Sequence, residues 1–260
     1  MKSNSTLPPH IRTTELAIGY SGKAIMDGID IGIDTGEIFF IIGGSGSGKS
    51  TLLKTLIGLI PPVSGDIYYG ETEFSEDDPV EQSRILRDTG VLYQGGALFS
   101  SMTLRENVAL PLRIHTKLSE SEILALADYK LGLVELGKAT QKYPHEISGG
   151  MMKRAGLARA LALDPSILFF DEPSAGLDPL TSRQLDETIL ELNQSLGTTI
   201  IIVSHELESI FTLADRAVFL DAATRRQMEV GKPQTMKNES SHEKIRDFLN
   251  RRKTTSNPST

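Results

Sequence analysis

One stretch of this sequence limits the possible folds more than any other: the apolar run Ile38–Ile42 leads directly into the glycine-rich stretch GGSGSGKST. The segment after it, Lys49–Gly58, carries apolar residues at helical spacing. We expect a strand, a tight turn and a helix in that order, and the turn fits the pattern G-x-x-x-x-G-K-[ST]. Glycines in such a turn leave backbone N–H groups free to face phosphate oxygens, and the helix adds its positive end. The stretch predicts a phosphate-binding loop.

Three side chains of this loop have distinct expected roles. Lys49 would reach the β- and γ-phosphates of a nucleotide, Ser50 would ligate Mg²⁺, and Thr51 would contact the α-phosphate. A flexible glycine loop without nucleotide is the alternative, and the flanking strand and helix argue against it. The predicted nucleotide-binding residues here are Gly43, Gly44, Ser45, Gly46, Ser47, Gly48, Lys49, Ser50 and Thr51.

A second apolar run, ILFFDE at Ile167–Glu172, ends in two acids. Buried strands of an α/β sheet present ligand-binding groups at their C-terminal edge. We therefore expect Asp171 to hold Mg²⁺ through water and Glu172 to polarise the attacking water as general base. Two acids that only cap a strand end are the alternative, which the phosphate loop in the same chain disfavours.

The motif ISGG at Ile147–Gly150 offers another anion site. Ser148 can cap the helix that begins near Met151, and the free N–H groups there can bind an anion. One phosphate loop needs no second anion site for the same nucleotide, so the motif is interpreted as serving the nucleotide of a second copy. A plain helix cap is the alternative.

Composition excludes several classes of protein. The chain has no cysteine, which rules out disulfides, thiolate metal sites and a cysteine nucleophile. Its net charge of −7 argues against a broad nucleic-acid surface, so no nucleic-acid partner is expected. No apolar run approaches the roughly 20 residues of a membrane span, and MKSNSTLPPH lacks the apolar core of a signal peptide. We expect a cytoplasmic chain that would need another subunit for any membrane role.

Other short apolar runs without alternation predict buried strands, and the intervening segments predict helices. This order is typical of a parallel sheet covered on both faces. The expected strands are Gly90–Tyr93, Ile167–Phe170, Thr199–Val203 and Ala217–Leu220. The expected helices are Leu118–Leu136, Gly150–Leu163, Thr181–Leu196 and Lys237–Lys253. The acidic segment Glu71–Asp88 should form an exposed linker plus a short helix, and residues 254–260 should be frayed.

The order of these motifs resembles the nucleotide-binding subunit of an ABC (ATP-binding cassette) transporter. The resemblance covers roughly Arg12 to Asp221 and is carried by GGSGSGKST, Gln94, ISGGM, ILFFDE, SAGLD and His205. It implies a P-loop NTPase of the α/β class, with a RecA-like core, an antiparallel β-subdomain and an inserted α-helical subdomain at about residues 95–161. The nucleotide-binding domain would occupy residues 1–236, and a C-terminal helix and tail would occupy residues 237–260.

In that family two ATP molecules are sandwiched between two subunits. Carried over by position, Ser148, Gly149 and Gly150 would contact the γ-phosphate on the partner, and Asp178 in SAGLD would communicate across the dimer. ATP and Mg²⁺ would be the cofactors, and a second copy of the chain would be one partner.

Three further residues take a role only through the resemblance. Gln94 would touch Mg²⁺ and the attacking water, and His205 would hold the γ-phosphate and orient Glu172. Tyr20 would stack on adenine, a type of contact worth about 1–3 kcal/mol in single-strand binders. Without the resemblance, a lone Gln94 is more typical of a surface amide and a lone His205 of a helix cap. Tyr20 could equally be a packing aromatic.

The motif ISGGM at Ile147–Met151 corresponds to the signature of the family, whose common form is LSGGQ. It departs from that form at Ile147 and Met151. Two stretches, ISGGMMKRAGLARALAL and the QGGALFSSMTLRENVALPLR that begins at Gln94, are similar to the ATPases that serve MCE-domain lipid transporters, such as the Mla phospholipid system. This implies a transmembrane permease partner, an MCE-domain lipid-binding protein, and a peripheral position on the cytoplasmic face of the inner membrane. The effect of Met151, the lipid head group and the direction of transport stay open.

Three functions are therefore weighed. The first is an ATPase that energises phospholipid transport. The second is the ATPase of a different ABC transporter or a soluble non-transport ABC ATPase, although this chain has one cassette and no coiled-coil insertion. The third is a nucleotide-binding module without hydrolysis, against which Lys49, Asp171, Glu172 and His205 argue. The apolar group in Gly95–Leu112 is either helical core or a docking patch for the permease, with Leu98 and Phe99 as first candidates.

Overall fold

The computed structural model describes residues 10–251, so the expected frayed end at 254–260 lies outside the described residues. The structure contains one large sheet. Half of this sheet is parallel, with its strands in the order β10-β4-β9-β8-β7. These strands are β4 (Ile38–Gly43), β7 (Thr89–Leu92), β8 (Ile167–Asp171), β9 (Thr199–Val203) and β10 (Arg216–Asp221). All five apolar runs are thus strands of one parallel array, as expected from the sequence.

The other half of the sheet is mainly antiparallel and uses the N-terminal part of the chain. It contains β1 (Ile11–Tyr20), β2 (Lys23–Ile29), β3 (Gly32–Ile33), β5 (Ser64–Tyr69) and β6 (Thr72–Glu73). A strand that the sequence did not predict, β11 (Arg226–Gly231), pairs antiparallel with β10 and parallel with β2. The expected antiparallel β-subdomain is therefore present and is continuous with the parallel core.

Each central strand is buried on both faces, which explains its unbroken apolar run. In β4, Phe40 belongs to one core cluster while Phe39 belongs to the other. Helix α1 (Lys49–Leu56) packs with the second cluster through Leu52, Leu53 and Leu56. The first cluster takes side chains from the helices on the opposite face, so the sheet lies between two layers.

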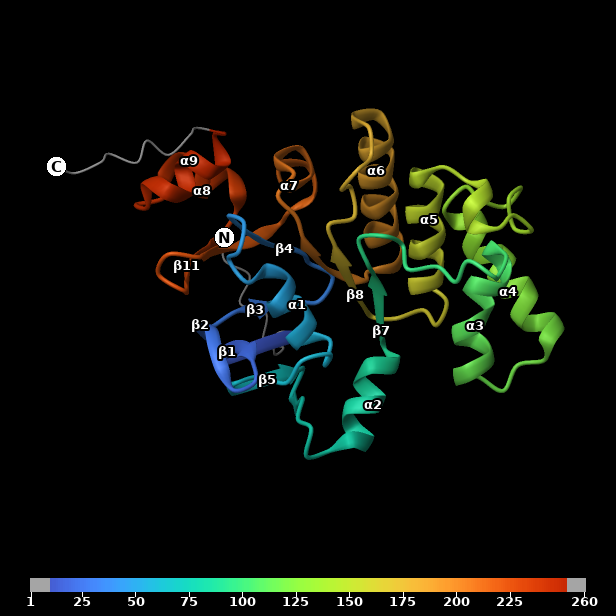
Figure 1. Cartoon of the computed structure of the whole chain (residues 1–260), viewed down its shortest axis with the longest axis horizontal. Coiled ribbons are helices and arrows are strands. Elements are labelled where there is room, and N and C mark those ends of the chain that lie inside the picture. The colour runs from blue at the N-terminus through green and yellow to red at the C-terminus, as the bar shows by residue number, and fades with distance from the viewer. Residues whose placement is uncertain (1–9, 252–260) are drawn as a thin grey trace.

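The helical insertion lies between β7 and β8 and stands at the right of Figure 1. It comprises α3 (Leu104–His115), α4 (Glu120–Leu133), the 3₁₀ turn Pro144–Glu146 and α5 (Gly149–Ala160). The remaining helices are α2 (Pro79–Arg87), α6 (Pro179–Leu196), α7 (Leu207–Leu213), α8 (Pro233–Glu239) and α9 (Glu243–Leu249). The fold is an α/β P-loop architecture with an inserted helical region; the domain division expected at residue 236 stays a prediction.

The single C-terminal helix expected at Lys237–Lys253 is wrong, because the chain breaks into α8 and α9 around Ser240. The Ser240 hydroxyl donates to the Glu229 carboxylate. The same hydroxyl accepts from the His242 N–H at 3.2 Å. Its carbonyl accepts from the Arg246 guanidinium. Serine hydroxyls compete in this way with helical hydrogen bonds, so the helix stops and restarts.

Candidate active site

The glycine loop joins β4 to α1 at the C-terminal edge of the parallel strands. A Cβ at Gly43 would lie 2.3 Å from the Leu220 carbonyl oxygen, and its φ is 149°, so only glycine fits there. Gly48 precedes α1 in the left-handed region, with φ 82°, and no side chain caps the helix. The first N–H groups of α1 are therefore available to an anion.

Lys49 lies folded across this loop. Its Nζ donates to the carbonyl oxygens of Gly43 and Gly44 at 3.0 and 2.9 Å. Burial lowers the pKa of Lys49, while the nearby charges of Glu172 and Asp171 oppose that shift. A hollow of about 270 Å³ adjoins the loop and is lined by Ile25, Gly46, Ser47, Gly48, Lys49, Ser50 and Thr51.

The hydroxyl of Ser47 supports a ligand at this loop. It is buried, and no residue among 10–251 gives it a hydrogen-bond partner. A buried hydroxyl without a partner costs free energy, which a bound polar group would recover. The uncapped N–H groups, the ammonium of Lys49 and this hydroxyl together suit a polyphosphate.

Ser50 and Asp171 are brought together from α1 and β8. The Ser50 hydroxyl donates to Asp171 Oδ1 at 3.4 Å. Within the described part of the chain, no three His, Asp or Glu side chains are placed to hold a metal ion. An oxygen pair of this kind suits Mg²⁺, which proteins commonly hold with one or two carboxylates plus substrate phosphates.

Glu172 and His205 form a second pair beside the first. His205 Nδ1 lies 2.9 Å from Glu172 Oε1, whereas Glu172 Oε2 is buried and unpartnered within residues 10–251. The backbone of Glu172 is held at φ 49°, a strained conformation for a non-glycine residue, and its N–H donates to Val203 O at 2.9 Å. One carboxylate oxygen is thus held by His205, and the other is left without a hydrogen-bond partner within residues 10–251.

Gln94 and Tyr20 lie at the borders of this group. Gln94 follows β7, its side chain is exposed, and its carbonyl accepts from Lys153 Nζ, which also donates to Glu172 O at 3.3 Å. Tyr20 is 50% exposed at the end of β1, and its hydroxyl lies 3.2 Å from Thr51 Oγ1. A half-exposed ring beside the loop is better placed to stack on a base than to fill the core.

The remaining predicted residues form a separate group at the starts of α5 and α6. The Ser148 hydroxyl accepts from the Met151 N–H at 3.3 Å, and Asp178 caps α6 by accepting from the Leu180 and Thr181 N–H groups at 3.1 Å. A Cβ on Gly150 would lie 2.4 Å from Thr181 Cγ2, so the two helix starts are packed together. In Figure 1, α5 and α1 stand on opposite sides of β8, so this group is set apart from the glycine loop.

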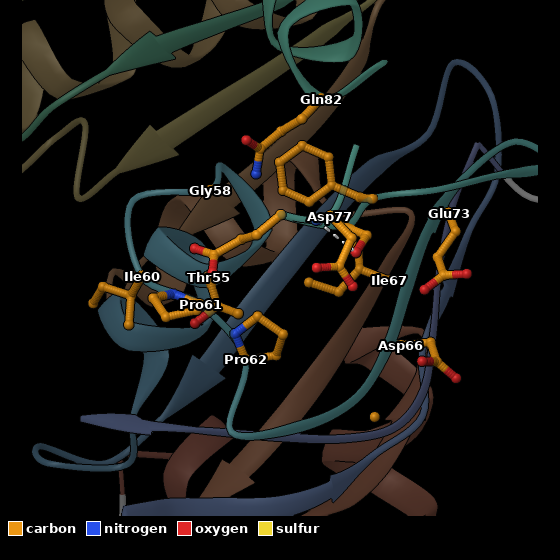
Figure 2. A pocket seen from close by; sticks show the side chains of 14 residues that line it. Thr55, Gly58, Ile60, Pro61, Pro62, Asp66, Ile67, Glu73, Asp77 and Gln82 are labelled. Atoms are coloured by element: carbon orange, nitrogen blue, oxygen red, sulfur yellow. Dashed lines mark hydrogen bonds between the residues drawn. The ribbon is translucent and has the colours of Figure 1, made fainter. Parts of the chain in front are cut away.

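A different cavity, of about 230 Å³, lies between the end of α1 and the acidic segment. Figure 2 shows the carboxylates of Asp66, Glu73 and Asp77 around it, together with Thr55 and Gln82. None of the predicted site residues lines it. Carboxylates repel phosphate oxygens, so this cavity is unsuited to the nucleotide.

A family model described as ABC transporter matches residues 26–175, which contain the glycine loop, the Ser148 motif and both strand-end acids. The chain belongs to the ABC transporter family. It is an ATP-binding, ATP-hydrolysing subunit of that family, which confirms the resemblance and the enzyme class expected from the sequence. Within residues 10–251, no helix has both the length and the apolar character needed to cross a membrane.

Three curated relatives differ in what their names say they transport. The probable ribonucleotide transport ATP-binding protein mkl of Mycobacterium tuberculosis is 42% identical over 94% of this chain and 67% of its own length. The intermembrane phospholipid transport system ATP-binding protein MlaF of Escherichia coli is 39% identical over 76% of this chain and 74% of its own length. The methionine import ATP-binding protein MetN of Rhizobium johnstonii is 39% identical over 82% of this chain and 58% of its own length.

Solved ABC cassettes share the fold. The dimeric, post-hydrolysis cassette MJ0796 bound to ADP and Pi is 28% identical with a TM-score of 0.77, over 85% of this chain and 98% of that one. The cbiO1 protein of Clostridium perfringens, part of the transporter complex cbiONQ, is 28% identical with a TM-score of 0.79, over 94% and 97% of the two chains. These likenesses confirm the α/β P-loop fold class.

Proposed function

We propose that this chain energises phospholipid transport between membranes, as the ATPase subunit of a complex with a transmembrane permease and an MCE-domain protein. The hydrolytic part of the proposal rests on one observation: the Ser50–Asp171 and Glu172–His205 pairs lie beside the Lys49 loop. The phospholipid part is supported by the likeness to MlaF and by Met151 in the signature. The relatives named for ribonucleotide and methionine transport favour a second candidate, the ATPase of a different transporter.

The roles of the residues follow from their positions. The N–H groups before α1 and the Lys49 ammonium bind the phosphates, and Tyr20 stacks on the adenine. Ser50, Asp171 and Gln94 would hold Mg²⁺, which would supply positive charge to offset that of the phosphates. The Glu172 carboxylate accepts a hydrogen bond from the attacking water, while His205 fixes Oε1 and reaches the γ-phosphate.

Two copies of the chain complete each site. Ser148, Gly149, Gly150 and Asp178 lie apart from the loop of their own chain, so they serve the nucleotide on the partner copy. The dimeric state of the related cassette MJ0796 supports this arrangement. Binding to the permease would then place the chain on the cytoplasmic face of the membrane, and the chain itself would not touch the lipid.

Phe99 is the better of the two candidates for docking the permease. It is 50% exposed, whereas Leu98 is partly buried against the core. Buried Asn107 fixes the segment: it accepts from the Phe99 N–H at 2.7 Å and donates to the Phe99 carbonyl at 3.1 Å. A rigidly presented aromatic is a typical anchor for a helix that docks in a groove.

We predict that Phe99→Glu abolishes co-purification with the permease, since losing one anchor can cost about 2 kcal/mol or more. Val80→Glu is the matched control, because Val80 is 82% exposed on α2, outside this segment. The assay is a pull-down with the permease encoded beside this chain, with ATP binding as the folding check. Unchanged capture of folded Phe99→Glu would place the interface elsewhere.

The cargo is tested by purifying the complex from membranes and identifying what co-purifies with the permease and its MCE-domain protein. We expect bound phospholipid and ATPase activity that rises when the complex sits in phospholipid vesicles. A complex that lacks an MCE-domain protein and responds only to a nucleotide or an amino acid would favour the second candidate.

A further inference from the structure

Lys153, which is not among the predicted site residues, is buried beside Gln94 and Glu172. Lys153 lies on α5 and is 5% exposed, although a lysine in the sequence of a helix is typical of a solvated face. Its ammonium donates to the carbonyl oxygens of Gln94 and Glu172, at 3.3 Å in the second case. Within the described residues it is paired with no carboxylate. A buried ammonium is costly, so both carbonyls must stay in place to stabilise it.

Each of these two carbonyls belongs to a residue whose placement matters for hydrolysis. Glu172 is held at φ 49°, where its carbonyl also accepts from the Ala175 N–H at 3.2 Å. A strained conformation persists only when the surrounding contacts fix it. Lys153 is one of these contacts, and it reaches Glu172 from α5.

The segment after Gln94 is fastened to the same helix. Arg159 donates to the carbonyl oxygens of Ala97 and Gly96 at 2.6 and 3.1 Å. A Cβ at Gly156 would lie 3.0 Å from Gly96 O, so the two backbones are in close contact. In Figure 1 the green segment that leaves β7 runs across α5 towards α3. The backbone of Gln94 is therefore set by α5 through Lys153.

We propose that Lys153 is a positioning residue for ATP hydrolysis: its ammonium fixes the Gln94 and Glu172 carbonyls against α5, and so sets where both side chains meet the attacking water. This inference rests on the proposed roles of Gln94 and Glu172. Lys153 makes no contact with the glycine loop among its hydrogen bonds, so it acts on turnover and leaves ATP binding unchanged.

The test measures kcat and KM for ATP in the purified subunit for Lys153→Met, Lys153→Gln and Lys153→Arg. We expect kcat to fall by about tenfold to a hundredfold in Lys153→Met, because small misplacements of reacting groups have effects of this size. Lys153→Gln, with one short donor, should be intermediate. Lys153→Arg should recover most of the wild-type kcat, and KM should stay within about twofold throughout.

Lys130→Met is the matched control. Lys130 is 2% exposed on α4 and pairs with Asp164, so its loss removes a buried ammonium away from the site. We expect Lys130→Met to lower the melting temperature and to leave kcat unchanged. Equal losses of kcat in the two methionine variants, or wild-type kcat in Lys153→Met, would overturn the proposal.

Two further comparisons of kcat keep the test decisive. If Lys153→Met does not fold, Lys153→Gln must still fall at least about threefold below Lys153→Arg in kcat, and equality would refute the positioning role. Glu172→Gln is measured alongside. Full activity of Glu172→Gln would overturn the proposed function itself, whereas loss in Glu172→Gln with wild-type activity in Lys153→Met would overturn this inference alone.

Discussion

In the proposed function, hydrolysis depends most directly on the Glu172 carboxylate, whose Oε1 is held by His205 and whose Oε2 has no protein partner in residues 10–251. Glu172→Gln keeps the shape and removes the proton acceptor. We predict that kcat falls by roughly 10²–10⁴-fold while ATP affinity is retained, since the glycine loop is untouched. Steady-state hydrolysis and equilibrium ATP binding measure the two effects.

Glu191→Gln serves as the control, because Glu191 is exposed on α6 and lies outside the site. It should match the wild-type kcat. A Glu172→Gln variant that turns over ATP within about threefold of wild type would show that another group activates the water.

Asp186 makes the stability of the fold depend on pH. It is 4% exposed on α6, and its Oδ2 accepts from the Ser209 hydroxyl of α7 at 2.7 Å. Burial raises the pKa of Asp186 to about 6 against the opposing Ser209 bond, and three acids add to the rise: Glu208, Glu206 and Glu187. The folded state thus binds this proton more tightly than the unfolded state does, so the stabilisation is complete below about pH 4 and lost as pH rises through about 6.

Asp186→Asn removes this titration and keeps a neutral group in place. We predict that the variant gains stability relative to wild type between about pH 5 and pH 7.5, by roughly 1–3 kcal/mol. Denaturant unfolding at the two pH values measures the change. Asp77→Asn, at an exposed loop position, is the control. Its difference from wild type in unfolding free energy should be the same at the two pH values. A pH-independent difference for Asp186→Asn would contradict the assigned titration.

At the scale of elements, glycine-to-alanine changes at two helical positions distinguish the effect of close packing from that of helix propensity. A Cβ at Gly156 in α5 would meet Leu92 Cδ1 at 2.8 Å and the Gly96 backbone at 3.0 Å, whereas one at Gly132 in α4 would meet nothing within 4 Å. We predict that Gly156→Ala destabilises the protein by about 1–3 kcal/mol. Gly132→Ala should stabilise it by roughly 0.5–1 kcal/mol. The free energies of unfolding of the two variants measure both changes. A Gly156→Ala variant as stable as wild type would show that the segment after β7 is not held against α5.

The parallel strands could be predicted from the sequence because strands buried on both faces have no polar side: Phe39 and Phe40 enter different core clusters, and both are fully buried. Helix α3 was not predicted, since Pro111 lies within it and a Gly- and Ser-rich stretch precedes it. Thr103 and Glu106 nevertheless form a capping box there, and this S/T-x-x-E pattern is visible in the sequence.

The proposed catalytic residues could be located from the sequence because each sits at a strand end or on a short motif, whereas the residues that hold them in place could not. Asp171 and Glu172 follow directly from an apolar run that stops at two acids. Lys153 gives no signal, because its burial comes from a segment 59 residues away that folds onto α5. The break at Ser240 likewise depends on Glu229 of another element. Long-range contacts of this kind are not encoded in local periodicity.

At the scale of the whole molecule, the predicted site residues lie in two groups: the loop, acids and histidine at one sheet edge, and Ser148 with Asp178 at the starts of α5 and α6. In the proposed function, the chain hydrolyses ATP only when the second group of one copy meets the nucleotide of another. The dimer, rather than the single chain, is then the catalytic unit.

A mixture of two inactive variants tests whether two copies share each ATP site. Lys49→Ala disables the loop, Ser148→Arg blocks the signature, and neither alone should hydrolyse ATP. In a mixed dimer, the intact loop of the Ser148→Arg chain meets the intact signature of the Lys49→Ala chain. With random pairing, half of the dimers are mixed and each has one working site of two, so we predict up to about a quarter of wild-type turnover. Mixing wild type with the Lys49→Ala/Ser148→Arg double variant should create no working site in mixed dimers. An inactive mixture of the single variants, together with fully active wild-type chains paired with the double variant, would contradict the shared site.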